Sequence, residues 1–140
     1  MRFLTLVFVL VMFSGCAAVT GPIQPGASNA DLIQLATDYR SALSRDEELS
    51  RLYSNFSISD SGAMLGTLEL NKKAWGDLSR AERDRIIKRA TGLYARQFAT
   101  SPAGILGVSS VTIKDDMGST RGWIVVCTCG VAQYSLYSSK

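Results

Sequence analysis

Hydrophobic spacing divides the chain into an apolar leader, a stretch without periodicity and a long periodic part. Residues 3–13 are apolar except for Thr5, and this run is shorter than the roughly 20 residues that a membrane-spanning helix needs. Residues 17–28 hold two prolines and two glycines and show no period, which indicates a flexible tether. Periodicity begins near Asn29, so we expect folded structure from there onward.

The first periodic segment predicts a helix that begins at Ser28 or Asn29, because Ser28 and Asp31 are spaced like a capping box. Ser44 and Glu47 have the same spacing, so we expect the helix to bend or divide there. Residues 57–62 then break the pattern. The apolar positions that recur at helical spacing are Leu32, Leu35, Ala36, Tyr39, Ala42, Leu43, Leu49, Leu52, Tyr53 and Phe56.

A clearer helix is predicted after Ser79, which forms a well-placed capping box with Glu82. Trp75 and Leu78 come just before it and are placed to pack against its start. Residues 101–104, Ser-Pro-Ala-Gly, are expected to end it. Its apolar face consists of Ile86, Ile87, Ala90, Leu93, Tyr94 and Phe98.

The last third of the chain changes to a pattern typical of strands. Residues 108–113, 123–129 and 131–137 are expected strands, and residues 115–118 supply a turn. Residues 63–70 fit either a short strand or a helical turn. Together these patterns predict an α+β fold in which two or three N-terminal helices pack on a small antiparallel C-terminal β-meander.

The amino-terminal end has the pattern of an export signal, with Arg2 before the apolar run and small residues after it. Phe13-Ser14-Gly15-Cys16 resembles the lipobox of bacterial lipoproteins, although that family usually has Leu where this chain has Phe13. The resemblance implies a diacylglyceryl thioether on Cys16, cleavage just before it, and acylation of the new amine by a fatty acid such as palmitate. The alternative is an ordinary secretory signal in which Cys16 is incidental.

The lipoprotein interpretation divides the chain into a signal peptide (1–15), a lipidated cysteine with its tether (16–28) and a single α+β domain (29–140). Ala17 stands where an Asp tends to retain a Gram-negative lipoprotein at the inner membrane. For a Gram-negative source, the resemblance therefore implies an outer-membrane anchor with the domain facing the periplasm.

Composition narrows the possible functions. The chain has 15 basic and 12 acidic residues, and a net charge of +3 is too weak to argue for a nucleic-acid partner. It has no histidine, which excludes Ser-His-Asp and Cys-His catalysis and every histidine-containing zinc site. We therefore expect no catalytic set, no cofactor and no metal site.

Cys127 and Cys129 are the most conspicuous polar feature of the predicted sheet. On a regular strand both sulfurs would lie on one face, with Cα atoms about 6.6 to 7 Å apart, at or beyond the usual limit for a disulfide. A bridge would need a bulge or turn, to which Gly130 could contribute. Three hypotheses remain open: small buried thiols, a disulfide, or a reactive or metal-binding pair.

A basic cluster is predicted on the second helix, where four cationic side chains fall opposite the apolar face. It forms either a contact surface for anionic lipid headgroups or an acidic partner, or an ordinary solvated face. Its members are Arg85, Lys88, Arg89 and Arg96.

The remaining aromatic and acidic candidates have simpler interpretations. Trp75 and Trp123 are expected in the core, because a domain of this size has few other large side chains to fill it. Tyr134 and Tyr137 would line a surface groove or cap the sheet. The pair Asp115-Asp116 is ordinary turn chemistry.

These observations favour a lipid-anchored envelope protein with a non-enzymatic binding or scaffold role. Its expected partners are the membrane, through the lipid, and an envelope protein that the sequence does not name. Two alternatives remain: a thiol or redox protein that uses Cys127 and Cys129, and a small inhibitor or immunity protein of an envelope enzyme. The inhibitor would act through the hairpin at residues 115–123.

Overall fold

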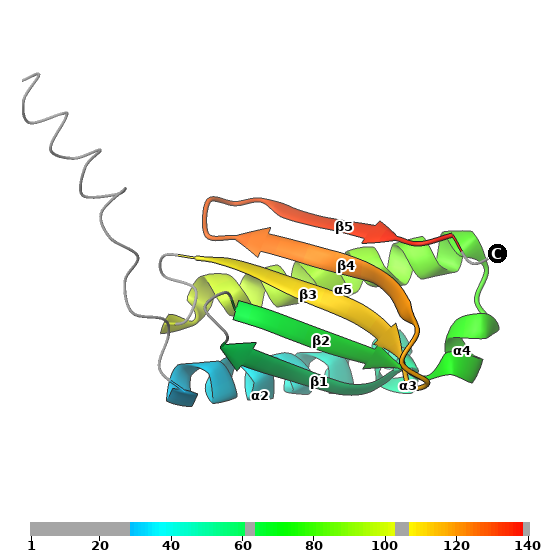
Figure 1. The fold of residues 1–140 in the computed structure, drawn as a ribbon, viewed down its shortest axis with the longest axis horizontal. Coiled ribbons are helices and arrows are strands. Elements are labelled where there is room, and N and C mark those ends of the chain that lie inside the picture. Colours follow the sequence, from blue (N-terminus) through cyan, green and yellow to red (C-terminus); the bar gives the residue numbers. More distant parts are fainter. Residues whose placement is uncertain (1–28, 61–63, 103–106, 139–140) are drawn as a thin grey trace, which may run out of the picture.

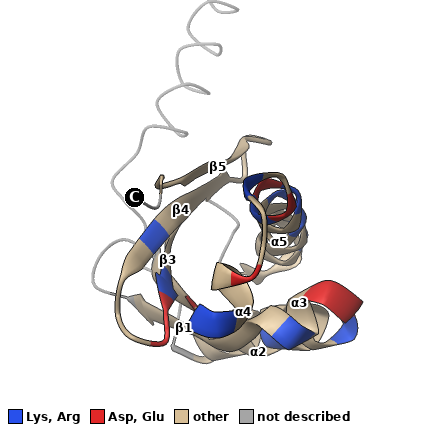
Figure 2. Ribbon diagram, turned by 90° about the vertical axis from the view of Figure 1, so that its right-hand side faces the viewer, with Lys and Arg blue, Asp and Glu red and all other residues tan. Residues whose placement is uncertain are grey.

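The computed structural model describes residues 29–60, 64–102 and 107–138, which form a curved sheet with helices against one of its faces (Figures 1 and 2). The predicted α+β class is confirmed, with five strands in the order β1-β2-β3-β4-β5. The elements in chain order are α2 (Asn29–Arg45), α3 (Glu47–Leu52), β1 (Tyr53–Asp60), β2 (Met64–Leu70), α4 (Lys72–Gly76), α5 (Arg80–Thr100), β3 (Val108–Asp115), β4 (Thr120–Cys127) and β5 (Ala132–Leu136).

The sheet as a whole is mixed, so the predicted antiparallel C-terminal meander is confirmed only for the last three strands. β3, β4 and β5 do form an antiparallel meander, but β2 pairs with β3 in parallel. The chain between β2 and β3 contains α4 and α5 and returns to the end of the sheet where β2 began. A crossover of this length is what a parallel pair requires, and the apolar pattern of β2 alone does not reveal the direction of its neighbour.

The helical stripe ends earlier than its spacing predicted. Helix α3 stops at Leu52, and the backbone of Tyr53 is extended with φ −79° and ψ 140°. Phe56 was expected on a helix, but it points into the core from strand β1, and Ile58 packs against the same core. The polar residues that alternate with them suit a strand with one solvent-facing side, so residues 57–60 continue β1 and do not break the structure.

The bend between α2 and α3 is capped by Asp46, which corrects the predicted pair Ser44 and Glu47. The Asp46 carboxylate accepts hydrogen bonds from the N–H groups of Glu48 and Leu49, both at 3.1 Å. A carboxylate in this place satisfies two free donors and complements the positive end of the helix. The proposed cap at Ser28 lies outside the described residues.

The start of α5 follows the prediction. The Ser79 hydroxyl accepts from the N–H of Glu82 at 3.2 Å, and the Glu82 carboxylate accepts from the N–H of Ser79 at 2.7 Å. The capping box is therefore complete and lowers the pKa of Glu82, chiefly through the backbone hydrogen bond from Ser79. The helix ends at Thr100 with Ser101 as its cap, as predicted.

Four aromatic rings join α2, α5 and the sheet. The ring of Tyr39 meets Phe56 edge to face with centroids 4.7 Å apart, and Tyr94 stands 4.9 Å from Tyr39. Phe98 stacks on Tyr94 at 6.1 Å. Both tyrosine hydroxyls have buried partners: Tyr39 donates to the carbonyl of Ala90 at 3.0 Å, and Tyr94 bonds to Ser109 on β3 at 2.6 Å. Burial raises the pKa of Tyr94 to about 12.

The two tryptophans have different environments. Trp75 is buried in the core from α4, as expected. Trp123 is only partly buried, and the prediction that it fills the core was wrong. Ile124 and Val126 on the same strand face the core, so the alternation of the strand directs Trp123 to the opposite face of the sheet. No described helix covers that face (Figure 2).

Asp115 has a structural role that its position beside a turn did not suggest. It is the last residue of β3 and is fully buried. Its carboxylate accepts two hydrogen bonds from Arg121, at 3.0 and 2.7 Å, and two from the N–H groups of Met117 and Ser119, both at 3.0 Å. The ion pair therefore closes the β3–β4 hairpin around one buried carboxylate.

Acid is expected to destabilise the protein through Asp115. Burial disfavours the charged carboxylate, but the bonds from Arg121, Ser119 and Met117 outweigh burial and hold its pKa below the ordinary 3.8. A lowered pKa in the folded state means stability that is complete above pH 3.8 and is lost as the pH falls through the folded-state pKa. Urea midpoints measured from neutral pH downward should show this loss of stability. The Asp115→Asn variant should be less stable than the unchanged protein at neutral pH, and its stability should lack the decrease in acid that comes from Asp115. An unchanged pH profile in Asp115→Asn would contradict this account.

Candidate functional site

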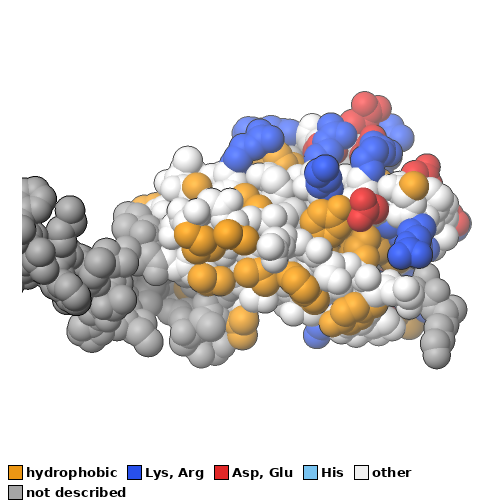
Figure 3. Space-filling view, turned by 90° about the horizontal axis from the view of Figure 1, so that it is seen from above, with side chains coloured by type: hydrophobic (Ala, Val, Ile, Leu, Met, Phe, Trp, Pro, Cys, Tyr) orange, Lys and Arg blue, Asp and Glu red, His pale blue; other side chains and the backbone are white. Residues whose placement is uncertain are grey.

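An open groove lies between the first half of α5 and strand β5. Its volume is about 800 Å³. Figure 3 views the molecule from the β5 side, where hydrophobic side chains form a band beside the charged side chains. The groove is lined by Trp75, by residues of α5 and β5 and by the residues just beyond β5, including Arg80, Arg83, Asp84, Tyr134 and Tyr137.

Hydrogen bonds hold the walls of the groove together. Tyr134 donates from its hydroxyl to the carboxylate of Asp84 at 2.9 Å, which connects β5 to α5. Burial, the hydrogen bond to Asp84 and the negative charge of the Asp84 carboxylate all raise the pKa of Tyr134. Arg83 lies over the ring of Trp75, 5.1 Å from its centre, and donates to the Trp75 carbonyl at 3.0 Å. These contacts fix the positions of aromatic and cationic side chains that line the groove.

The groove also borders an edge of the sheet. Strand β5 is last in the strand order and pairs with β4, and no other strand of the described residues pairs with it. Tyr137, just beyond β5, is 55 % exposed, and Arg80 is exposed at the start of α5. An edge strand with exposed aromatic and basic neighbours can accept an extended peptide and contact its side chains.

Sequence reasoning identified half of this groove. Tyr134 and Tyr137 were expected to line a groove or cap the sheet, and the structure places both in the groove. The α5 wall was missed, because Arg80 and Asp84 look like ordinary exposed residues of a helix start. Their spacing of four puts them on one helix face, but only the docking of β5 beside that face turns it into a wall.

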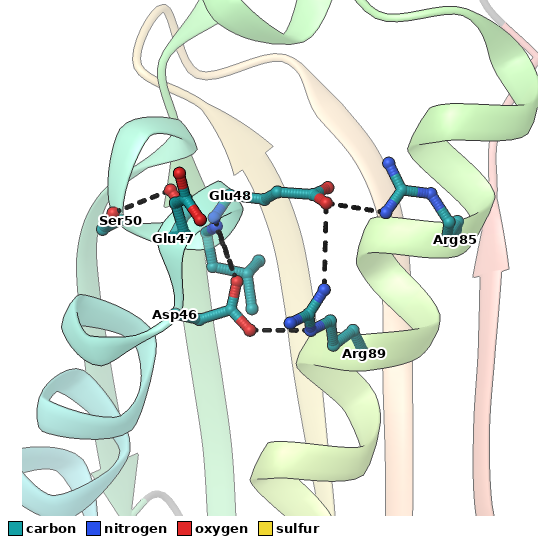
Figure 4. Close-up of polar contacts among 7 residues, drawn as sticks. Asp46, Glu47, Glu48, Ser50, Arg85 and Arg89 are labelled. Carbon is teal, nitrogen blue, oxygen red and sulfur yellow. Dashed lines mark hydrogen bonds and ion pairs between the residues drawn. The ribbon is translucent and has the colours of Figure 1, made fainter.

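Two of the four cations in the predicted basic cluster pair with carboxylates of the protein itself (Figure 4). Arg85 forms an ion pair with Glu48 at 2.7 Å, and Arg89 pairs with Asp46 at 2.7 Å and with Glu48 at 3.8 Å. The hydrogen bond from Arg85 lowers the pKa of Glu48. Two of the four cations therefore attach α5 to the bend before α3.

The other two cations of the cluster, Lys88 and Arg96, are exposed. Among the described residues, no carboxylate lies within ion-pair distance of either one. The ion network also borders a smaller hollow of about 290 Å³, lined by Leu52, Ala74 and Leu78 among others. The cluster is thus a connection between helices with two cations left facing solvent.

The cysteine pair lies at the hairpin between β4 and β5. The strand ends at Cys127, and Cys129 falls in the turn that follows, so the expectation of one strand through residue 129 was wrong. The turn brings the two Cα atoms to 5.0 Å, and the sulfurs form a disulfide. The turn glycine, Gly130, has a φ of +94°, a conformation that a residue with a side chain rarely adopts.

Some candidates cannot be placed in this geometry. Cys16 and the tether lie outside the described residues. Within residues 29–60, 64–102 and 107–138, no group of three or more cysteine or carboxylate side chains is arranged to hold a metal ion. None of the helices in that part of the chain is both long and apolar enough to cross a membrane.

No family model and no curated protein matches the chain. Among solved structures, the chain is similar to a sex pheromone precursor from Lactobacillus salivarius subsp. salivarius UCC118, with 13 % sequence identity and a TM-score of 0.47. The match covers 83 % of this chain and 34 % of the other, so this chain spans about a third of that protein. A TM-score of this size does not establish a shared fold.

Proposed function

We propose that this protein is an envelope lipoprotein, anchored through a lipid on Cys16, whose domain binds another envelope protein. The anchor is supported by the leader and by the resemblance of residues 13–16 to a lipobox. A binding role requires no catalytic side chains, and the chain has no histidine to serve as a general base. The α5–β5 groove is the observation that carries the binding role.

The groove suits an extended segment of a partner protein. Such a segment can pair with β5 along its free edge and place its side chains against Tyr134 and Tyr137. Arg80, at the start of α5, would contact an acidic residue of the segment. Tyrosine and arginine are enriched in protein interfaces because they bury a large area and still satisfy polar atoms.

Lipidation is tested by Cys16→Ser. Cells that express the unchanged chain and are fed labelled palmitate should yield labelled protein in the membrane fraction. The variant should lose the label and keep its leader, because the acceptor sulfur is absent. Cys129→Ser is the matched control and should be labelled normally. Equal labelling of Cys16→Ser and the unchanged chain would refute the anchor.

Partner binding is tested with a photo-crosslinking residue placed at one position at a time. At Tyr137, beside the groove, we expect a discrete crosslinked protein in the membrane fraction. At Met117, which is 73 % exposed in the β3–β4 turn, we expect none. The crosslink at position 137 should weaken when Cys16→Ser is added, because tethering raises the local concentration of the partner. Crosslinks that are equal at the two positions, or absent at both, would refute the groove as the binding surface.

A further inference from the structure

The β4–β5 turn presents the disulfide at the surface. Cys129 is exposed in the turn, and Cys127 is partly buried at the end of β4. Among the described residues, Val108 and Val131 lie beside the pair and are 55 % and 43 % exposed. Val108 is the residue of β3 directly opposite Cys127. A sulfur pair in this position is accessible to another molecule.

The disulfide contributes little to holding the hairpin. It links residues two apart, so it removes little freedom from the unfolded chain. Backbone bonds already close the turn: Gly130 donates to the carbonyl of Cys127 at 3.1 Å, and Cys127 donates to that of Val131 at 2.9 Å. The N–H of Thr128 bonds to the carbonyl of Gly107 at 3.2 Å. The turn should therefore persist when the sulfurs are reduced.

One sulfur is better prepared to leave than the other. The N–H of Cys129 donates a hydrogen bond to the sulfur of Cys127 at 3.0 Å. Such a donor stabilises negative charge on that sulfur, and thiol exchange is faster when the departing sulfur is a stable thiolate. The exposed sulfur of Cys129 is the accessible point of attack.

We propose that Cys127 and Cys129 form a thiol–disulfide exchange site that oxidises a pair of cysteines in a partly unfolded polypeptide. A thiolate of the substrate attacks the sulfur of Cys129, and the bond to Cys127 breaks with Cys127 leaving as a thiolate. The second substrate thiolate then attacks the first substrate sulfur and displaces Cys129. The substrate gains a disulfide and loses two electrons and two protons, and the protein becomes a dithiol with the same electrons and protons.

A polypeptide fits the surroundings better than a small thiol does. Val108 and Val131 offer exposed apolar surface on either side of the sulfurs. A small hydrophilic thiol gains nothing from that surface, whereas an unfolded segment can bury its own apolar side chains there. This proposal concerns the hairpin alone and does not depend on the lipidation of Cys16 or on the groove.

The test uses the full chain in detergent with Cys16→Ser in every sample, so that only the hairpin sulfurs react. The oxidised protein is mixed with a reduced peptide that has two cysteines between apolar residues. Mass spectrometry after an acid quench should find the peptide disulfide and the protein dithiol in equal amounts. Cys127→Ser combined with Cys129→Ser should lose this oxidation completely, while circular dichroism remains unchanged.

Single variants test the assigned roles. With oxidised peptide, Cys127→Ser should accumulate a mixed disulfide at Cys129, and Cys129→Ser should form one more slowly, because Cys127 is partly buried. Val108→Ser should slow reaction with the peptide by about 5-fold, as expected for the loss of one partly buried apolar contact, and leave reaction with dithiothreitol unchanged.

Three results would overturn the exchange site: protein that purifies with both thiols free, oxidised protein that reacts no faster than the double variant, or reduction only together with unfolding. A Val108→Ser variant that slows both reagents equally, or neither of them, would overturn the assignment of a polypeptide substrate.

Discussion

Replacing Phe56 by alanine should lower the free energy of unfolding by about 3–5 kcal/mol, the range for removing a buried phenylalanine. Phe56 is 0 % exposed, and its ring meets Tyr39 and Tyr94 edge to face. Edge-to-face pairs contribute about 0.5–1.5 kcal/mol beyond the buried area, so the loss should fall high in this range. Urea unfolding monitored by circular dichroism measures the change.

Tyr137→Ala is the control, since it also removes an aromatic ring but one that is 55 % exposed. Surface substitutions of this kind usually change the free energy of unfolding by less than about 0.5 kcal/mol. Similar losses in Phe56→Ala and Tyr137→Ala would show that the aromatic cluster does not organise the core.

Gly122→Ala should detach β5 from the sheet. Gly122 lies on β4 opposite Leu136, and a Cβ there would fall far inside contact distance of the carbonyl oxygen of Ser135. Backbone cannot move aside as a flexible side chain can, so we expect a cost of about 1–3 kcal/mol, as for overpacking in a core. Faster hydrogen exchange at the amides of β5, with β1 and β2 still protected, would locate the damage.

The matched control is Gly92→Ala on α5, where a Cβ would meet nothing within 4 Å. Alanine is favoured over glycine inside a helix by about 0.8–1.0 kcal/mol, so this variant should be more stable than the unchanged protein. The same chemical change is thus predicted to have opposite signs at two positions. Stabilisation by Gly122→Ala would contradict the observed packing of β4 against β5.

Local chemistry predicted α5 well. Its capping box at Ser79 and Glu82 acts within one turn of chain, so the information needed to locate the helix start lies within four residues. The same reasoning failed at residues 53–56, because Phe56 fits both a spacing of four from Leu52 and an alternation with Ile58. Pairing with β2 decides between the two, and that pairing is not local.

The candidate sites could be predicted only where their residues lie close together in the sequence. The cysteines of the hairpin were identified from their spacing, but the end of β4 at Cys127 and the turn at Gly130 decide that they can bond. The groove was not predictable as a whole, because α5 and β5 are distant in sequence and meet only in the folded sheet. The partner of Arg89 was missed for the same reason, since Asp46 approaches it from the distant bend between α2 and α3.

The parallel pairing of β2 with β3 has a consequence for the order of folding. Until the last third of the chain is available, strand β2 has no partner along the edge at which β3 pairs in the folded protein. The core-facing side chains of the β1–β2 pair, Phe56, Leu68 and Leu70, then also lack the packing that β3 and the strands beyond it provide. During synthesis from the amino terminus, the chain would therefore expose an open sheet edge and apolar side chains until β3 has been made. Such intermediates associate readily with one another and with chaperones. We expect folding to be limited by the arrival of β3, and a chain shortened before Val108 to aggregate.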